Sequence, residues 1–215
     1  MSNSVSIIDY YAQRANEYER IYQKPERQSD LAKLKQLFQE LLSGQSILEI
    51  ACGTGYWTQA VSQTASSITA TDFNEEVLQI ARKKDYGCTV DFRKADAFAL
   101  NLQEKFSAGL AVAWWSHLQK SEVRNFLSQF HRQFPAGAQI VFMDNRFVTG
   151  SNTPISRVDE EGNTYQLRKL ENGSEFEVLK NFPTRQEAEE LIRDLVAEFS
   201  WTELTYYWVL TYKLK

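Results

Sequence analysis

The sequence predicts an α/β protein. We expect a three-layer α/β/α, doubly wound domain with a seven-stranded, mostly parallel sheet and a β-hairpin insertion after the fifth strand. Short apolar runs alternate with amphipathic helical segments between residues 46 and 144, which is typical of a parallel sheet with helices on both faces. The alternation stops after residue 149. There an Asn-Gly step at 172–173 separates two runs of strand-like composition, and this step is a strong hairpin signal.

The N-terminal region, residues 1–43, is expected to form two helices. Apolar and aromatic residues recur at helical spacing over 7–22 and again over 29–42, where leucines and Phe38 fall on one side. The alternating segments then follow in this order: strand 46–50, helix 56–64, strand 67–71, helix 75–84, strand 88–93, strand 107–113, helix 120–134 and strand 138–144.

The remaining segments complete the sheet and its insertion. They are a hairpin with strands 164–170 and 174–179, a helix from 184 to about 197, and strands 201–205 and 207–213. In open sheets of this kind ligands bind at the carboxyl ends of the strands. Glu49, Asp72 and Asp96 follow or end three of the expected strands, so we expect these carboxylates to lie near a ligand.

The most informative stretch is the turn from Glu49 to Gly55. It places an acid at the end of an apolar strand and small residues at positions 51, 53 and 55, just before a helix. Small residues let the backbone approach a ligand closely, and the first N–H groups of the helix face polar ligand atoms. The Glu49 carboxylate suits an ammonium group better than a phosphate. A dinucleotide turn, G-x-G-x-x-G, would also need glycine where Thr58 stands.

This turn resembles the first motif, acid-x-Gly-x-Gly-x-Gly, of the class I S-adenosylmethionine-dependent methyltransferases, with Ala51 replacing the first glycine. The resemblance covers about residues 46–147 and implies their Rossmann-like fold. It implies that Asp72 holds the ribose hydroxyls, that Phe73 packs on the adenine, and that Asp96 accepts from the adenine amine. Without the resemblance, Asp72 reads as a helix cap and Phe73 as a core aromatic.

The N-terminal stretch Tyr-x-x-Arg-Ala-x-x-Tyr at 11–18 is similar to one that folds over the cofactor in some members of this family, where the arginine pairs with the methionine carboxylate. A plain amphipathic helix is the alternative. The expected cofactor-binding residues are Tyr11, Arg14, Tyr18, Glu49, Ala51, Cys52, Gly53, Gly55, Trp57, Asp72, Phe73, Asp96, Ala97, Ala113 and Trp114.

The activity that the resemblance implies is transfer of a methyl group from S-adenosylmethionine to a small-molecule acceptor, leaving S-adenosylhomocysteine. The protein then supplies alignment, exclusion of water and, where needed, a base. The expected catalytic residues are His117, after the fourth strand, and Asp144, after the fifth. The expected substrate-binding residues are Trp115, Arg146 and Tyr165, and residues 149–182 are expected to cap the acceptor.

Two other functions remain open at this point. One is a catalytically silent regulatory protein that binds S-adenosylmethionine. The other is an aminopropyl transferase that uses a decarboxylated donor, although Glu49 and Arg14 favour a donor that retains its amino-acid end. No motif specifies the acceptor atom.

Composition limits the remaining choices. The 215 residues suit a single domain, 1–215, and no apolar run approaches the length of a membrane span. The polar N-terminus does not resemble a secretory signal, and the two cysteines, Cys52 and Cys88, fit a reducing cytoplasm. Histidine and cysteine spacing predicts no metal site. The net charge of −4 argues against nucleic acid, and we expect a cytoplasmic monomer or homodimer without a membrane partner.

Overall fold

Most of the chain is built around one seven-stranded sheet. The computed structural model describes the backbone of residues 2–215 and the side chains of residues 7–215; Met1, which begins the expected region 1–43, lies outside the described residues. The strands of the main sheet lie in the order β3 (Thr89–Lys94), β2 (Ser67–Asp72), β1 (Ser46–Ile50), β4 (Ala108–Val112), β5 (Gln139–Asn145), β10 (Tyr207–Leu214) and β9 (Val196–Glu203).

The strand directions match the expected fold class. β3, β2, β1, β4 and β5 are parallel, and β10 runs antiparallel to both β5 and β9. β1 and β4 lie in the centre and are buried on both faces, which fits their largely apolar sequences. The prediction of a seven-stranded, mostly parallel sheet is therefore confirmed.

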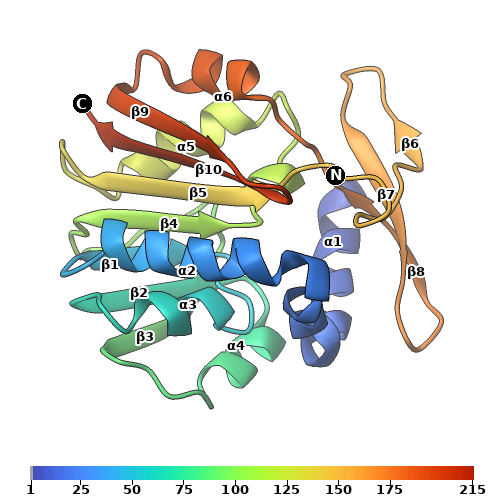
Figure 1. Ribbon diagram of the computed structural model, residues 1–215, viewed down its shortest axis with the longest axis horizontal. Helices are drawn as coiled ribbons and strands as arrows, with labels where there is room; N and C mark the ends of the chain where they lie inside the picture. Colours follow the sequence, from blue (N-terminus) through green and yellow to red (C-terminus); the bar gives the residue numbers. More distant parts are fainter. Residues whose placement is uncertain (1) are drawn as a thin grey trace.

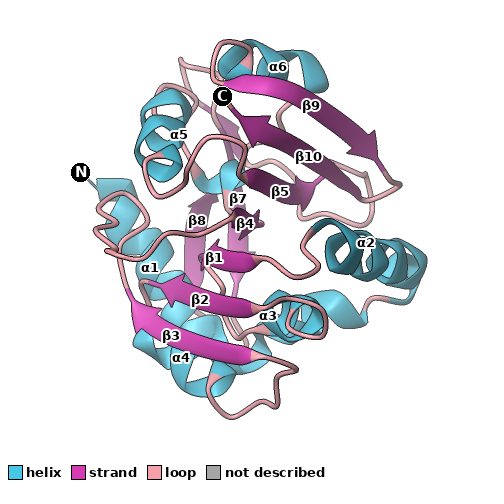
Figure 2. Ribbon diagram, turned by 90° about the vertical axis from the view of Figure 1, so that its left-hand side faces the viewer, coloured by secondary structure: helices cyan, strands magenta, loops and turns pink. Residues whose placement is uncertain are grey.

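Helices cover both faces of this sheet (Figures 1 and 2). α2 (Gln28–Leu41) and α3 (Tyr56–Val61) share one core with inward residues of the strands, while α5 (Val123–His131) and α6 (Arg185–Ile192) share the other. α4 (Glu75–Ala81) packs beside β2 and β3. Among the helices of the described part of the chain, none combines the length and apolarity needed to cross a bilayer.

The N-terminal segment differs from the single helix expected over 7–22. α1 (Ser2–Arg14) is followed by a 3₁₀ helix, η1 (Ala15–Gln23), and a short turn, η2 (Pro25–Arg27). A 3₁₀ helix aligns residues three apart on one side. Ala15, Tyr18 and Ile21 have this spacing: Ala15 is buried, and Tyr18 and Ile21 are half-buried against the core that contains α2 and α3.

The predicted hairpin is present and forms a small separate sheet. β7 (Thr164–Lys169) and β8 (Glu175–Leu179) are antiparallel around the Asn-Gly turn, and β6 (Arg157–Val158) pairs with β7. Figure 1 shows this sheet and α1 beside each other, beyond the carboxyl ends of the parallel strands. A small apolar core of Tyr10, Leu170 and Val178 joins them. We call residues 149–182, which include this sheet, the cap.

One C-terminal boundary is corrected. The helix expected to reach about residue 197 ends at Ile192, and β9 begins at Val196. Pairing with β10 extends as far as Leu214, opposite Val196, across a bulge after Lys213. These long-range hydrogen bonds override the local helical pattern, which shows how tertiary pairing outweighs propensity.

Candidate functional site: two adjoining cavities at the carboxyl ends of the strands

A cavity of ≈ 440 Å³ lies at the carboxyl ends of β1, β2, β3 and β4, beneath α1. Its volume falls in the usual range of about 300–1,000 Å³ for small-molecule sites. The predicted site residues that line it are Tyr11, Tyr18, Ala51, Gly53, Asp72, Phe73, Asp96, Ala97, Ala113, Trp114 and His117. The structure also adds residues that the sequence did not single out, among them Ile8, Asn74 and Phe98.

Backbone strain concentrates at this cavity. Ala51, after β1, has φ 50°, and Ala113, after β4, has φ 54°. Among the described residues these are the non-glycine positions in the left-handed region, which costs a residue with a Cβ roughly 1–2 kcal/mol. Both line the cavity. Strain of this kind persists where the surrounding structure fixes the backbone, and it clusters at functional sites.

Hydrogen bonds join the glycine turn after β1 to the carboxylate of Asp72, the last residue of β2. Asp72 accepts hydrogen bonds from the N–H of Gly53 at 2.9 Å and from the N–H of Asn74 at 2.9 Å. Burial raises the pKa of Asp72, while these N–H donors act in the opposite direction. The Phe73 ring stays 43% exposed at the edge of the cavity. The predicted juxtaposition of glycine turn, acid and aromatic ring is thus present in space.

Glu49, in β1, does not line the cavity. Its side chain is 1% exposed, and its Oε2 has no hydrogen-bond partner within the described part of the chain. Burial raises the pKa of this carboxyl to about 8, and the charge of Asp72 adds to the rise. In this structure Glu49 is a buried acid next to the glycine turn, and its contact with a ligand stays a prediction.

Three other residues of the turn region, Cys52, Gly55 and Trp57, likewise do not line the cavity, and their contact with a cofactor stays a prediction. Cys52 is buried and donates its N–H to the Thr71 carbonyl. Gly55 has φ 78°, and a Cβ there would come within 2.5 Å of the Tyr86 hydroxyl, so its role is close packing. Trp57 is 3% exposed and packs in the core against Phe38.

His117 lies in the wall of the first cavity, and both of its ring nitrogens form hydrogen bonds. Nδ1 lies 2.7 Å from the Leu179 carbonyl, and Nε2 lies 2.7 Å from the Tyr11 hydroxyl. A carbonyl only accepts, so Nδ1 carries the proton, and the neutral ring accepts at Nε2 from Tyr11. Burial, followed by the charges of Lys180 and Arg168, lowers the pKa of His117 well below its usual value. The ring is thus neutral, with a defined tautomer.

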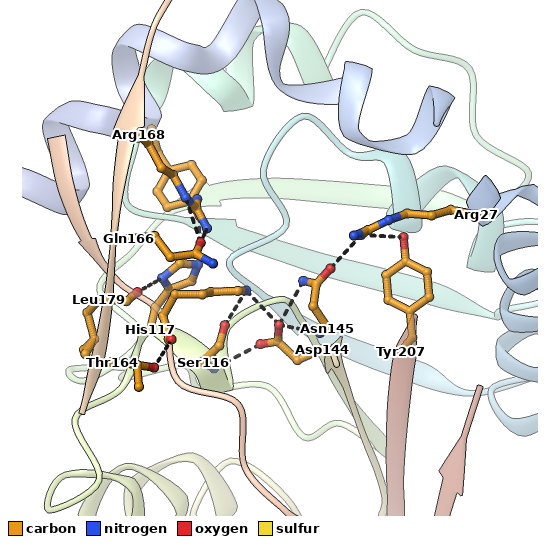
Figure 3. Close-up of polar contacts among 12 residues, drawn as sticks. Arg27, Ser116, His117, Asp144, Asn145, Thr164, Gln166, Arg168, Leu179 and Tyr207 are labelled. Carbon is orange, nitrogen blue, oxygen red and sulfur yellow. Dashed lines mark hydrogen bonds and ion pairs between the residues drawn. The ribbon is translucent and has the colours of Figure 1, made fainter. Parts of the chain in front are cut away.

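Asp144 lies outside both cavities, at the base of the cap (Figure 3). It is fully buried and accepts from Lys180 Nζ at 2.9 Å and from the Ser116 N–H at 3.0 Å. Burial alone raises the pKa of such an acid, but the charge of Lys180 and the hydrogen bond from the Ser116 N–H lower the pKa of Asp144 overall. Through Lys180, Asp144 joins the cap to β5, and its catalytic role stays a prediction.

The expected substrate-binding residues also lie away from the cavities. Trp115, in the short helix η3 (Trp115–His117), is 3% exposed and packs edge-on against Trp208. Arg146 pairs with Glu203 at 3.1 Å. Tyr165 is 3% exposed and donates its hydroxyl to Asp159 at 3.0 Å, inside the cap. Packing of strands against the cap, which no local pattern encodes, decides these orientations.

A second cavity, of ≈ 320 Å³, adjoins the first and extends under the cap. Both are lined by Tyr11, Tyr18, Val112 and Ala113. Arg14, expected at the cofactor, lines this second cavity, where its guanidinium lies over the rings of Tyr10 and Tyr18. The sequence alone does not single out its other cationic residues: Lys24, Arg27, Arg168, Lys169 and Lys180.

Comparisons with known proteins agree with this arrangement. Residues 47–137 match the family described as "Methyltransferase domain". A malonyl-[acyl-carrier protein] O-methyltransferase of Bacillus cereus is 36% identical over 103 residues, covering 46% of this chain and 38% of that protein. A demethylmenaquinone methyltransferase of Lactococcus lactis is 27% identical over 114 residues, covering 50% and 45%. The aligned part therefore spans less than half the length of these curated relatives.

Solved structures extend the similarity to nearly the whole chain. A complex of DhpI with SAH superposes with a TM-score of 0.79 at 25% identity, covering 97% of this chain and 95% of that one. The shared part includes the cap as well as the sheet, since so little of either chain is left out. The fold, the glycine turn and these similarities are those of the class I S-adenosylmethionine-dependent methyltransferases.

Proposed function

We propose that the chain binds S-adenosylmethionine and transfers its methyl group to a small-molecule acceptor. The observation that carries this proposal is the meeting of two cavities at Tyr11, Tyr18 and Ala113. A group-transfer enzyme needs a donor site and an acceptor site that share a boundary, so that the reacting atoms are aligned.

The residues of the first cavity fit the donor. Asp72 and Asp96 offer carboxylates for ribose hydroxyls and an exocyclic amine, and the half-exposed Phe73 ring offers a surface for a purine. Arg14 carries a charge suited to the donor's carboxylate at the boundary of the second cavity. When bound, S-adenosylmethionine supplies a methyl group activated by a sulfonium.

The chain's own contribution is positioning and proton transfer. Tyr11 donates to His117 Nε2, so a proton taken by the phenol oxygen has a path onto the imidazole. A neutral His117 with its Nδ1 proton held by Leu179 suits a general base. Trp114 and Ala113 form an apolar wall next to this pair and help to keep water away from it.

Donor binding tests the proposal directly. Asp72→Asn should weaken S-adenosylhomocysteine binding by about tenfold to a hundredfold, because one charge-assisted hydrogen bond is worth roughly 1.5–3 kcal/mol. Calorimetry measures the effect, and Asp85→Asn, at an exposed position, is the matched control. Unchanged affinity in Asp72→Asn would contradict the placement of the ribose.

Turnover needs a second experiment. The purified chain, methyl-labelled S-adenosylmethionine and a fractionated metabolite extract should yield a labelled small molecule. Donor binding without any labelled product would favour the silent regulatory protein instead. We further propose a cytoplasmic monomer or homodimer that acts on free small molecules rather than nucleic acid, supported by the net charge of −4. Light scattering and cell fractionation check these two points.

A further inference from the structure

The second cavity is strongly cationic although the chain as a whole is acidic. Its lining includes Arg14, Lys24, Arg27, Arg168, Lys169 and Lys180. Among its described lining residues, Glu17 is the acidic one. The whole chain carries a net charge of −4, so this cavity is positively charged in a protein whose net charge is negative.

Most of these charges lack an acidic partner. Lys180 pairs with Asp144 and Lys169 with Glu175. In the part of the chain with described side chains, residues 7–215, Arg14, Lys24, Arg27 and Arg168 form no ion pair within 4 Å. Buried charges are normally paired, because an uncompensated charge is costly away from water.

Arg27 is the clearest case. It is 5% exposed, yet its guanidinium contacts only neutral acceptors: Ser151 Oγ at 2.9 Å, Asn145 Oδ1 at 2.9 Å and, more distantly, the Tyr207 hydroxyl at 3.5 Å. These bonds orient the group without neutralising it. Asp30, one helical turn later, instead accepts from the Tyr206 N–H at 2.8 Å.

Arg168 approaches from the cap on the other side (Figure 3). Its guanidinium donates to Gln166 Oε1 at 2.8 Å and lies 3.5 Å from the Tyr11 hydroxyl. β7 thus turns its polar residues inward. Gln166 is 2% exposed, while the intervening Leu167 is 52% exposed. Gln166 and Arg168 are two residues apart on β7 and both line the second cavity, so this face of the strand presents polar groups to it.

The cations also lie close enough to act on one another. Burial lowers the pKa of Lys24, and the charges of Arg27 and Arg14 lower it further, while Glu26 acts in the opposite direction. Burial likewise lowers the pKa of Lys180, with Arg168 and Arg27 contributing and Asp144 opposing them. A group of like charges held together in this way is stabilised by an anion that binds among them.

We propose that the second cavity binds the anionic end of the methyl acceptor, a small molecule that bears a carboxylate or phosphoryl group, through Arg27, Arg168 and Lys24. This inference rests on the proposed function and specifies its substrate class. In this proposal Arg14 binds the carboxylate of the donor, not the anionic group of the acceptor. Anchoring at Arg27 and Arg168 places the remainder of the acceptor toward Tyr11 and Ala113, where the two cavities meet.

The test uses the full chain and two probes, inorganic phosphate and succinate, titrated by calorimetry with and without saturating S-adenosylhomocysteine. We expect saturable binding of at least one probe. We expect Arg168→Gln and Lys24→Gln each to weaken it by about tenfold or more, because each removes a charge-assisted contact. Arg157→Gln, which removes an arginine paired with Glu177 in the cap, is the matched control and should bind like the parent.

The two probes separate phosphoryl from carboxylate acceptors. Failure of both to bind, or equal binding by the parent and both variants, overturns the inference. Arg27→Gln is a third variant for the same titration, used if its melting temperature is close to that of the parent. Arg168→Gln and Lys24→Gln are sufficient without it. S-adenosylhomocysteine affinity should stay within about twofold in Lys24→Gln and Arg168→Gln, a difference of about 0.4 kcal/mol. Absence of S-adenosylhomocysteine binding in the parent, with anion binding kept, refutes the donor site and leaves the anion site standing.

Discussion

His117 illustrates how single residues acquire their properties from the fold. The sequence places it after the fourth strand, and an ordinary imidazole there would titrate near pH 6.5. In the structure, burial and neighbouring cations lower the pKa of His117 well below this value. A base is active when deprotonated, so its activity extends to lower pH than the sequence alone predicts.

We therefore expect kcat to stay flat from pH 8 down to about 6.5 and to fall only below that range. His117→Ala should lower kcat by at least about a hundredfold with donor affinity kept, the usual contribution of a general base. Tyr11→Phe, which removes the hydroxyl on Nε2, should lower kcat as well. Rate–pH profiles of the three proteins check this. A parent profile that falls already at or above pH 6.5 would contradict it.

Glu49 should make the folded chain less stable as the pH rises, whereas a carboxylate with a lowered pKa makes it more stable. Its folded-state pKa of about 8 lies above the ordinary value of 4.5, so between these two values the folded chain holds a proton that the unfolded chain has released. The free energy of unfolding should therefore fall as pH rises from 4.5 to 8.

Glu49→Gln removes this titration. At pH about 8.5 the variant should melt at least about 3 °C above the parent, while at pH about 5 the two should be close, since 1 kcal/mol corresponds to about 2–4 °C at this chain length. Calorimetric melting at both pH values measures the difference. An equal shift at both would mean that the carboxyl does not titrate in this range.

At the scale of elements, the cap is fixed to the sheet by a buried ion pair. Lys180 Nζ contacts Asp144 and also donates to Ser116 Oγ at 2.6 Å, all in the interior. Breaking a buried pair from one side costs more than removing both charges. The sheet and the cap are therefore energetically coupled through Lys180.

Lys180→Met should destabilise the chain by about 3–5 kcal/mol because it leaves the Asp144 charge buried and unpaired. Adding Asp144→Asn should recover about 2 kcal/mol of that loss. Urea unfolding of the two single variants and the double variant measures the coupling. Additive effects would show that the pair is not what fixes the cap.

The elements also show what sequence predicts and what it does not. β1, β2 and β5 are short segments rich in apolar or β-branched residues between turn signals, so their predicted bounds agree with the structure to within a residue or two. The predicted start of β9 does not, because it depends on pairing with β10. The Asn172-Gly173 step predicts the hairpin, but which of its residues face inward depends on how β7 and β8 dock on α1.

The same reasoning applies to the site. The turn, Asp72, Phe73 and Asp96 follow a sequential motif on strand ends, so the first cavity is predictable from the sequence. Arg27 and Arg168 are far apart in the chain and meet only through the tertiary structure. No spacing rule identifies such a pair in advance.

At the scale of the whole molecule, charge is separated between surface and interior. The chain is acidic overall, but the second cavity is cationic. A cationic cleft with low-dielectric walls attracts anions, and salt screens this attraction.

For an anionic acceptor, raising NaCl from about 20 to about 300 mM should lower kcat/KM by roughly threefold to tenfold, mainly through KM. Arg168→Gln should have a weaker salt dependence than the parent. Initial rates at fixed donor concentration provide the measurement, and Arg157→Gln serves as the reference. A salt dependence identical in all three proteins would place the attraction elsewhere on the surface.

The hydrogen bond from His117 Nδ1 to the Leu179 carbonyl joins two distant parts of the chain. The donor of this bond follows β4 of the main sheet, and the acceptor belongs to the cap. Without this carbonyl, a neutral imidazole would be free to carry its proton on either nitrogen. The cap therefore does two things at once: it lines the second cavity, and it sets which nitrogen of His117 accepts from Tyr11.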